Sequence, residues 1–116
     1  MITIPTKRAY IWRAVYSDET VVCEENVDNF ASVDASRVAS LFLYPLQGDA
    51  AHRVDVPQGA TPVFFRRHPL EINVMQGSEA WRPTFHCIGW KRGDEAVYLF
   101  ISDDGSTLLT DNLQAV

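Results

Sequence analysis

Residues Pro83 to Thr110, PTFHCIGWKRGDEAVYLFISDDGSTLLT, decide the fold of this chain. Strand-favouring residues fill the stretch, and two turn signals, Gly93-Asp94 and Asp104-Gly105, divide it into three parts. The first turn predicts the pairs Arg92–Glu95, Trp90–Val97, Ile88–Leu99 and His86–Ile101. The second turn sets Ile101 against Leu108. The stretch therefore predicts an antiparallel meander with one densely apolar face.

Alternation of apolar and polar residues predicts more strands before the meander. Tyr10 to Tyr16 has this period-two pattern, with its aromatic residues on one face. Further strands are expected at 20–23, 41–44, 52–56, 63–68 and 70–75. A short helical turn is expected within 32–40, with Ser32 or Asp34 as its N-cap. About eight short strands predict one all-β, or mainly β, domain over residues 1–116, either an antiparallel sandwich or a small barrel.

Proline, glycine and polar residues predict where the loops lie. Pro62 and Pro69 confine their region to sheet edges or strand ends, because proline cannot donate a hydrogen bond to a ladder. Loops are expected at 24–30, around 47–49 and at 76–82. The last four residues, 113–116, are expected to form a loosely held tail.

Length and charge limit the classes of partner. The chain has 116 residues, enough for one domain with its own core. Its formal net charge is −5, which disfavours nucleic acid and anionic membranes as partners. Eight of the ten cationic residues are arginine, the residue suited to bidentate contacts. These counts favour a protein surface over a nucleic acid.

The cysteine and terminal patterns predict a cytoplasmic protein. Cys23 and Cys87 are far apart and form no CxxC motif, so two reduced thiols are expected. Met1 to Pro5 lack the basic start and apolar run of a signal peptide. No apolar run approaches the roughly 20 residues of a membrane-spanning helix.

The most unusual local cluster is Phe64-Phe65-Arg66-Arg67-His68. Strand alternation would put Phe65 and Arg67 on one face, and Phe64, Arg66 and His68 on the other. Such a mixture is able to grip a phosphate or carboxylate, or to stack on a base. The simpler reading is an edge strand whose arginine stems cover apolar surface.

Other candidate residues carry weaker signals. Trp81 beside Arg82 is either a binding hot spot or a tryptophan folded over the end of the domain. His86 and Cys87 are neighbours in a strand and point to opposite faces, so they cannot share a metal ion. The chain has no GxSxG, GxGxxG or GxxxxGK motif. We therefore expect no metal, no cofactor and no catalytic residues.

Several short motifs carry a resemblance. They are Trp12-x-Ala14-x-Tyr16-x-Asp18, Asp34-x-Ser36-Arg37, Pro57-x-Gly59 leading to Phe65-Arg66-Arg67, and Gly89-Trp90 before Tyr98. Together they resemble small uncharacterised proteins encoded by bacteriophages and prophages. The chain departs from that pattern at Asp18-Glu19, where Asp-Gly would be expected. The resemblance implies a phage-borne accessory protein and assigns no catalytic residue.

Three functions follow as hypotheses. The first is a non-enzymatic protein-binding domain that inhibits a host protein such as a defence nuclease. The second is a small-ligand or enzymatic site at a barrel mouth, built from Arg37, Arg66, His68 and Trp81. The third is a minor phage structural component, which predicts a homo-oligomer. The candidate binding residues are Arg37, Arg66, Arg67, His68, Trp81 and Arg82.

Overall fold

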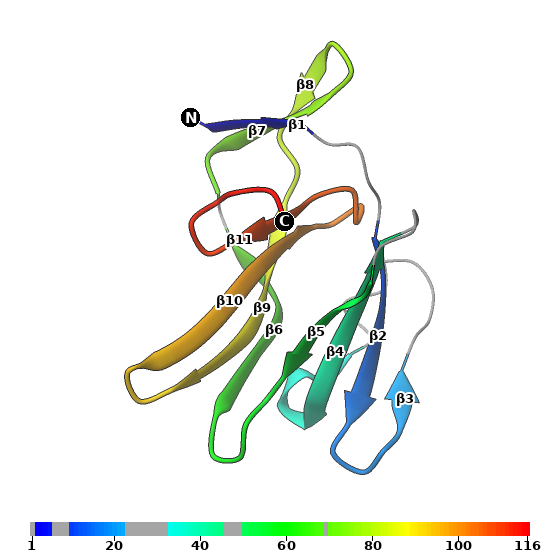
Figure 1. The fold of residues 1–116 in the computed structure, drawn as a ribbon, viewed down its shortest axis with the longest axis vertical. Helices are drawn as coiled ribbons and strands as arrows, with labels where there is room; N and C mark the ends of the chain where they lie inside the picture. The colour runs from blue at the N-terminus through cyan, green and yellow to red at the C-terminus, as the bar shows by residue number, and fades with distance from the viewer. Residues whose placement is uncertain (1, 6–9, 23–32, 46–49, 69) are drawn as a thin grey trace.

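The computed structural model describes all residues except 1, 6–9, 23–32, 46–49 and 69. The described residues form eleven strands and one 3-10 helix. The elements are β1 (Ile2–Pro5), β2 (Tyr10–Tyr16), β3 (Val21–Val22), η2 (Ala35–Arg37), β4 (Val38–Pro45), β5 (His52–Asp55), β6 (Thr61–His68), β7 (Ile72–Gln76), β8 (Glu79–Trp81), β9 (Phe85–Arg92), β10 (Glu95–Ser102) and β11 (Leu108–Thr110). They form three sheets, and two of these sheets stack as a sandwich (Figure 1).

The first sheet, here called the meander sheet, has the strand order β11-β10-β9-β6. Its central hairpin has the predicted register, which includes Arg92 opposite Glu95 and Ile88 opposite Leu99. Ile101 lies opposite Leu108, also as predicted. The turn between β9 and β10 has Gly93 at a φ of 58°, the conformation that favours glycine. Local turn chemistry therefore fixes this part of the fold.

The turn between β10 and β11 differs from the prediction. The N–H of Gly105 donates to the carbonyl of Ser102 at 2.9 Å, so the turn is centred on Asp103 and Asp104 rather than on Asp104 and Gly105. Gly105 follows the turn with a φ of 75°. The Asp104 carboxylate then accepts a 2.9 Å hydrogen bond from the N–H of Ser106. The positive-φ residue therefore follows the turn instead of standing at its centre, and the strand register is unchanged.

The second sheet, here called the N-terminal sheet, has the order β3-β2-β4-β5. Along β2, buried and half-buried residues alternate as the sequence predicts. The expected strand at 41–44 is longer and begins at Val38, whereas the expected strand at 20–23 is short. The expected helical turn is η2, and the Asp34 side chain caps it by accepting from the N–H of Ser36.

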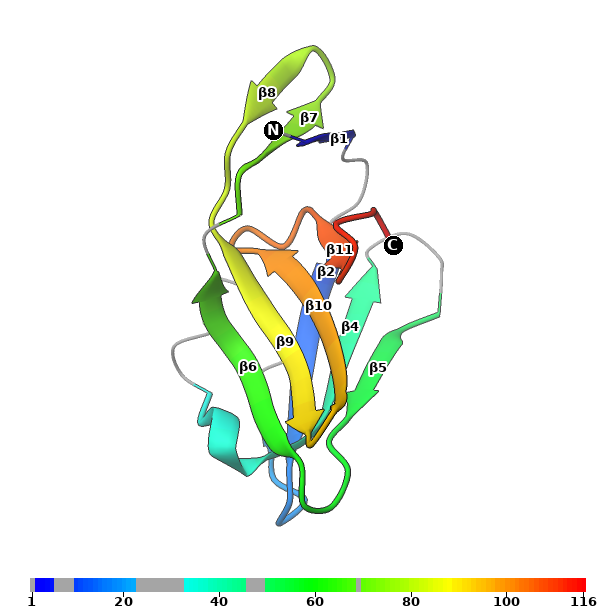
Figure 2. The ribbon, with the colours of Figure 1, turned by 90° about the vertical axis from the view of Figure 1, so that its left-hand side faces the viewer.

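The main core lies between these two sheets (Figure 2). Its buried members from the N-terminal sheet are Tyr10, Trp12, Ala14, Tyr16, Val38, Leu41, Leu43 and Val54, and those from the meander sheet are Phe64, Ile88, Ile101 and Leu108. Trp90 and Leu99 are partly buried against the same core. The apolar face of the meander is thus covered by the earlier strands, which confirms the prediction of a mainly β sandwich.

The third sheet, here called the cap sheet, was not predicted. Its order is β1-β7-β8, and β1 pairs with β7 in parallel. The predicted loop at 76–82 contains the short strand β8, which returns after Gly77. Figure 1 shows this sheet at one end of the sandwich, at the end opposite the turn between β9 and β10. A second apolar cluster joins Ile4, Ile72, Val74, Phe85, Cys87, Phe100 and Leu109.

A β-bulge in β6 overturns the predicted alternation of Phe64 and Phe65. Phe64 pairs with Ile88 and Arg66 pairs with Cys87, so Phe65 is the extra residue. Phe65 has a φ of 60°, and both phenylalanines pack against the main core. The bulge shifts the alternation of the strand by one residue, which places Arg66 and His68 on the outer face, beside Cys87 and Phe85.

The C-terminal tail is also held more firmly than predicted. The N–H of Val116 donates to the carbonyl of Leu108 at 3.0 Å, and the N–H of Thr110 donates to that of Gln114 at 2.8 Å. Leu113 packs against the second cluster. The expected loops at 24–30 and 47–49 lie outside the described residues. No helix in the described part of the chain has the length and hydropathy to span a membrane.

Candidate functional site

Four of the predicted binding residues lie near the end of β6, where the chain leaves the sandwich for the cap sheet, and the register places Arg66 and Arg67 on opposite faces of that strand. Arg66, Arg67 and His68 are the last residues of β6, and all three are exposed. β6 is an edge strand of the meander sheet, as its prolines predict. Arg82 is exposed on the connection from β8 back to β9. We call these four residues the cationic corner.

Aromatic and thiol groups of β9 and β10 adjoin this corner. The His68 ring packs edge-on against the Phe100 ring, with the two centroids 5.1 Å apart. Burial raises the pKa of the Cys87 thiol to about 11, and the nearby Arg66 charge lowers it in part. Cys87 is a free thiol, and it is buried. A buried, protonated thiol is a poor nucleophile, so the role of Cys87 in this site is to pack in the second apolar cluster.

A cavity of about 310 Å³ opens at the corner. Arg67 and His68 line one side, and Leu70, Pro83 and Thr84 line the rest. The last residue of β6 pairs with the first residue of β9 here, just below the cap sheet (Figure 2). The described lining holds one imidazole and no carboxylate, so it lacks a carboxylate partner for general acid–base chemistry.

Within the described part of the chain, the arginines of the corner lack the carboxylate partners that most of the other described arginines have. Arg37, Arg53 and Arg92 each pair with a carboxylate at 2.8 to 3.0 Å. Among the described residues, no carboxylate lies within ion-pairing distance of Arg66, Arg67 or Arg82. The corner therefore presents three positive charges that no carboxylate in the described part of the chain compensates, on a protein of net charge −5.

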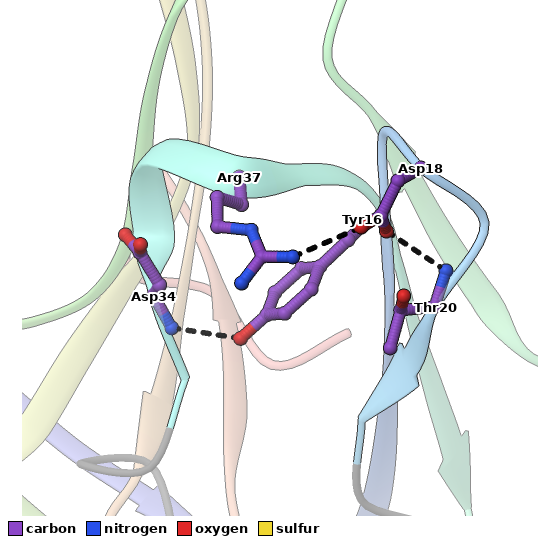
Figure 3. A network of polar contacts seen from close by, with 5 residues as sticks. All are labelled: Tyr16, Asp18, Thr20, Asp34 and Arg37. Atoms are coloured by element: carbon purple, nitrogen blue, oxygen red, sulfur yellow. Dashed lines mark hydrogen bonds and ion pairs between the residues drawn. The ribbon is translucent and has the colours of Figure 1, made fainter.

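Arg37 does not belong to this corner. Figure 3 shows its guanidinium lying over the Tyr16 ring, 4.4 Å from the centroid. One of its nitrogens pairs with Asp18 at 3.0 Å, and the Tyr16 hydroxyl accepts from the N–H of Asp34 at 3.0 Å. These contacts tie η2 to the turn after β2. The structure therefore gives Arg37 a partner within its own fold.

Trp81 is the last residue of β8 rather than a loop residue, and it is half-buried against the second apolar cluster. It lies opposite Val74 in the cap sheet. Its indole Nε1 is buried without a hydrogen-bond partner in the described part of the chain. The side chain is thus part of the packing between the cap sheet and the sandwich, next to the corner that Arg82 joins.

The outer face of the N-terminal sheet carries a second group that the sequence reading missed. Arg13 of β2 and Arg53 of β5 each lie 5.2 Å from the Phe42 ring of β4, one on either side of it. Arg13 also lies 5.5 Å from the Tyr44 ring. In the sequence, the alternating pattern placed Arg13 on the face opposite Trp12. The residues that it contacts could be identified only from the register of β2, β4 and β5.

The described residues contain no group of three or more histidine, cysteine, aspartate or glutamate side chains arranged to hold a metal ion. The candidate site is therefore a surface of arginine, histidine and aromatic groups. Comparison with known proteins adds no assignment, since the chain matches no protein-family model, no curated protein and no solved structure.

Proposed function

We propose that this chain is a non-enzymatic protein-binding domain that docks an acidic protein surface on its cationic corner. The observation that carries the proposal is the exposure of three guanidinium groups, those of Arg66, Arg67 and Arg82, for which the described residues supply no carboxylate. The chain has fifteen acidic residues, yet none in the described part pairs with these three. A partner carboxylate is the group that would complete them.

The chemistry of the corner favours a protein over other partners. Arginine forms planar, bidentate contacts with carboxylates and is enriched at binding hot spots. The exposed His68 ring, which packs on the buried Phe100 ring, supplies an aromatic component of such a surface. The net charge of −5 repels polyanions such as DNA at long range, whereas a local acidic patch meets the corner at short range.

The resemblance to bacteriophage and prophage proteins sets the first partner to test. In our proposal that partner is a host protein, such as a nuclease of a defence system, and binding blocks its activity. The rigid sandwich below the corner supports this role, because a preformed surface loses little conformational entropy on docking.

Variants matched in charge test the proposal. Arg66→Gln with Arg67→Gln removes two unpaired charges, whereas Arg37→Gln with Arg92→Gln removes two paired ones. Tagged wild-type protein and both double variants would be used to capture proteins from a host lysate, at several salt concentrations. We expect a captured protein that the Arg66/Arg67 variant loses and the Arg37/Arg92 variant keeps, and whose capture weakens as salt rises.

Two results would contradict the proposal. One is capture that both double variants lose equally, since charge in general would then be responsible rather than the corner. The other is that wild-type protein, monodisperse by light scattering, captures nothing at native expression levels. Arg82→Gln is a separate single variant, and a partial loss with it would extend the contact surface to the β8–β9 connection.

A further inference from the structure

We propose that a second site, on the outer face of the N-terminal sheet, binds the carboxylate of a small organic acid with an apolar body. The site is a cavity of about 330 Å³ whose described lining is Ile11, Trp12, Arg13 and Tyr44. We call it the Arg13 pocket. It shares no residue with the cationic corner, so this inference does not depend on the proposed function.

The guanidinium of Arg13 is held in place by its neighbours. One terminal nitrogen donates a 2.7 Å hydrogen bond to the Tyr44 hydroxyl. The group also lies 5.2 Å from the Phe42 ring and 5.5 Å from the Tyr44 ring. These two rings are themselves stacked, with centroids 6.2 Å apart and planes inclined by 18°. A fixed guanidinium loses little side-chain entropy when it binds an anion.

Arg13 nevertheless has unused hydrogen-bonding capacity. Its Nε is buried and has no hydrogen-bond acceptor in the described part of the chain. The described residues also place no carboxylate within ion-pairing distance of this guanidinium. A buried donor without an acceptor is costly to a fold, and an anion that reaches Nε would remove that cost. The arrangement is therefore that of a binding site rather than of a structural ion pair.

The charge and shape of the surroundings select the class of ligand. Arg53, which also lies 5.2 Å from the Phe42 ring, has its charge offset by Asp55 at 2.8 Å. A guanidinium that has no carboxylate partner among the described residues suits a monoanion, and a carboxylate matches its planar donors. Ile11 and the Tyr44 ring supply apolar walls, and the volume lies in the range of small-ligand pockets. A dianionic phosphate would leave more of its acceptors unpaired here.

Titration with 3-phenylpropionate, followed by NMR of the arginine Nε–H signals, tests the site. We expect the Arg13 signal to shift and to saturate, and 3-phenylpropionamide, the neutral analogue, to bind at least about tenfold more weakly. Arg13→Gln should weaken binding of the acid by a similar factor. Arg13→Lys keeps the charge but loses the fork of donors, so it should recover part of the affinity. Arg92→Gln, at the far hairpin, is the matched control and should bind like wild type.

A second arm identifies the source of the carboxylate. Acetyl-Ala-Phe with a free carboxyl group and its C-terminal amide are compared with the small acid. Tighter binding of the free peptide would point to a chain terminus as ligand, and tighter binding of 3-phenylpropionate would point to a free small acid. Equal affinity for acids and amides, no saturable shift with either acid, or full affinity in Arg13→Gln would overturn the proposal. Circular dichroism confirms that each variant is folded.

Discussion

The backbone carbonyl oxygen of Val97 occupies the space that a β-carbon on residue 89 would need, so Gly89 is the one residue type that fits there. Gly89 lies in the middle of β9, opposite Tyr98, with a φ of 151°. Side chains of this hairpin alternate between the two apolar clusters, with Ile88 and Ile101 in the main core and Cys87 and Phe100 in the second cluster. The meander that organises the fold therefore requires glycine at position 89, because the partner strand leaves no room for a side chain there.

Gly89→Ala should destabilise the protein strongly, because the new methyl group clashes with backbone rather than with a movable side chain. We expect a loss of at least about 3 kcal/mol in the free energy of unfolding, measured by urea denaturation. Gly59→Ala is the control. Gly59 also has a positive φ, of 82°, but nothing lies within 4 Å of its added β-carbon. It should cost about 1 kcal/mol, from backbone strain alone. Equal losses in the two variants would contradict this account.

The meander was predictable because its determinants are local. Two turns and a period-two pattern fix its register, and no distant residue is needed. The cap sheet was not predictable on the same grounds, since β1 pairs with β7 across most of the chain and β8 has three residues. Parallel pairing of such distant segments leaves no short-range signal.

The candidate sites likewise include residues that the local sequence identified and residues that only the folded structure brings together. Arg66, Arg67 and His68 attracted notice through local composition, and the structure keeps them together at one strand end. Arg37 did not join them because its partner, Asp18, comes from another turn. The Arg13 pocket was missed because it needs the register of three strands. Two adjacent phenylalanines before the arginines were the available sign of the bulge, since a regular strand would send them to opposite faces, whereas both pack against the main core.

At the bulge residue Phe65, we expect the glycine variant to be more stable than the alanine variant, the reverse of the usual order. Its ring packs at 5.0 Å from the Trp12 ring, while its backbone has a positive φ. Phe65→Ala should lose about 2 kcal/mol from the lost packing. Phe65→Gly loses the same ring but relieves the backbone strain, so it should be about 1 kcal/mol more stable than the alanine variant. Chemical denaturation of both proteins measures the difference. Greater stability of the alanine variant would mean that residue 65 does not hold the left-handed conformation.

The cap of η2 predicts how acid destabilises the protein. The hydrogen bond from the Ser36 hydroxyl is the main cause that lowers the pKa of Asp34 below its usual 3.8. Hydrogen bonds from Thr20, with a smaller contribution from Arg37, lower the pKa of Asp18 in the same way. Because both pKa values are lower in the folded state, the stabilisation is present above the unfolded-state pKa. It is lost as pH falls through the folded-state pKa.

We therefore expect the free energy of unfolding to decline between about pH 5 and about pH 2. Asp34→Asn retains a capping side chain but no longer titrates, so its decline should be shallower. Asp34→Ala removes the cap and should be less stable than wild type throughout the neutral range. Thermal melts over a pH series, at constant ionic strength, measure all three proteins. A decline in Asp34→Asn as steep as in wild type would exclude Asp34 as a contributor.

The reactivity of the Cys87 thiol should report on the packing beneath the cationic corner. With its pKa raised to about 11 by burial, roughly one molecule in a thousand carries the thiolate at about pH 8. N-ethylmaleimide should therefore leave Cys87 unmodified in the native protein and modify it fully in denaturant, with peptide mapping used to separate it from Cys23. Arg66→Gln removes the one charge that favours the thiolate, so it should leave Cys87 at least as protected. Rapid modification of native Cys87 would show instead that the outer face of β9 opens to solvent, and the arginines of β6 would then stand on a mobile edge rather than on a rigid one.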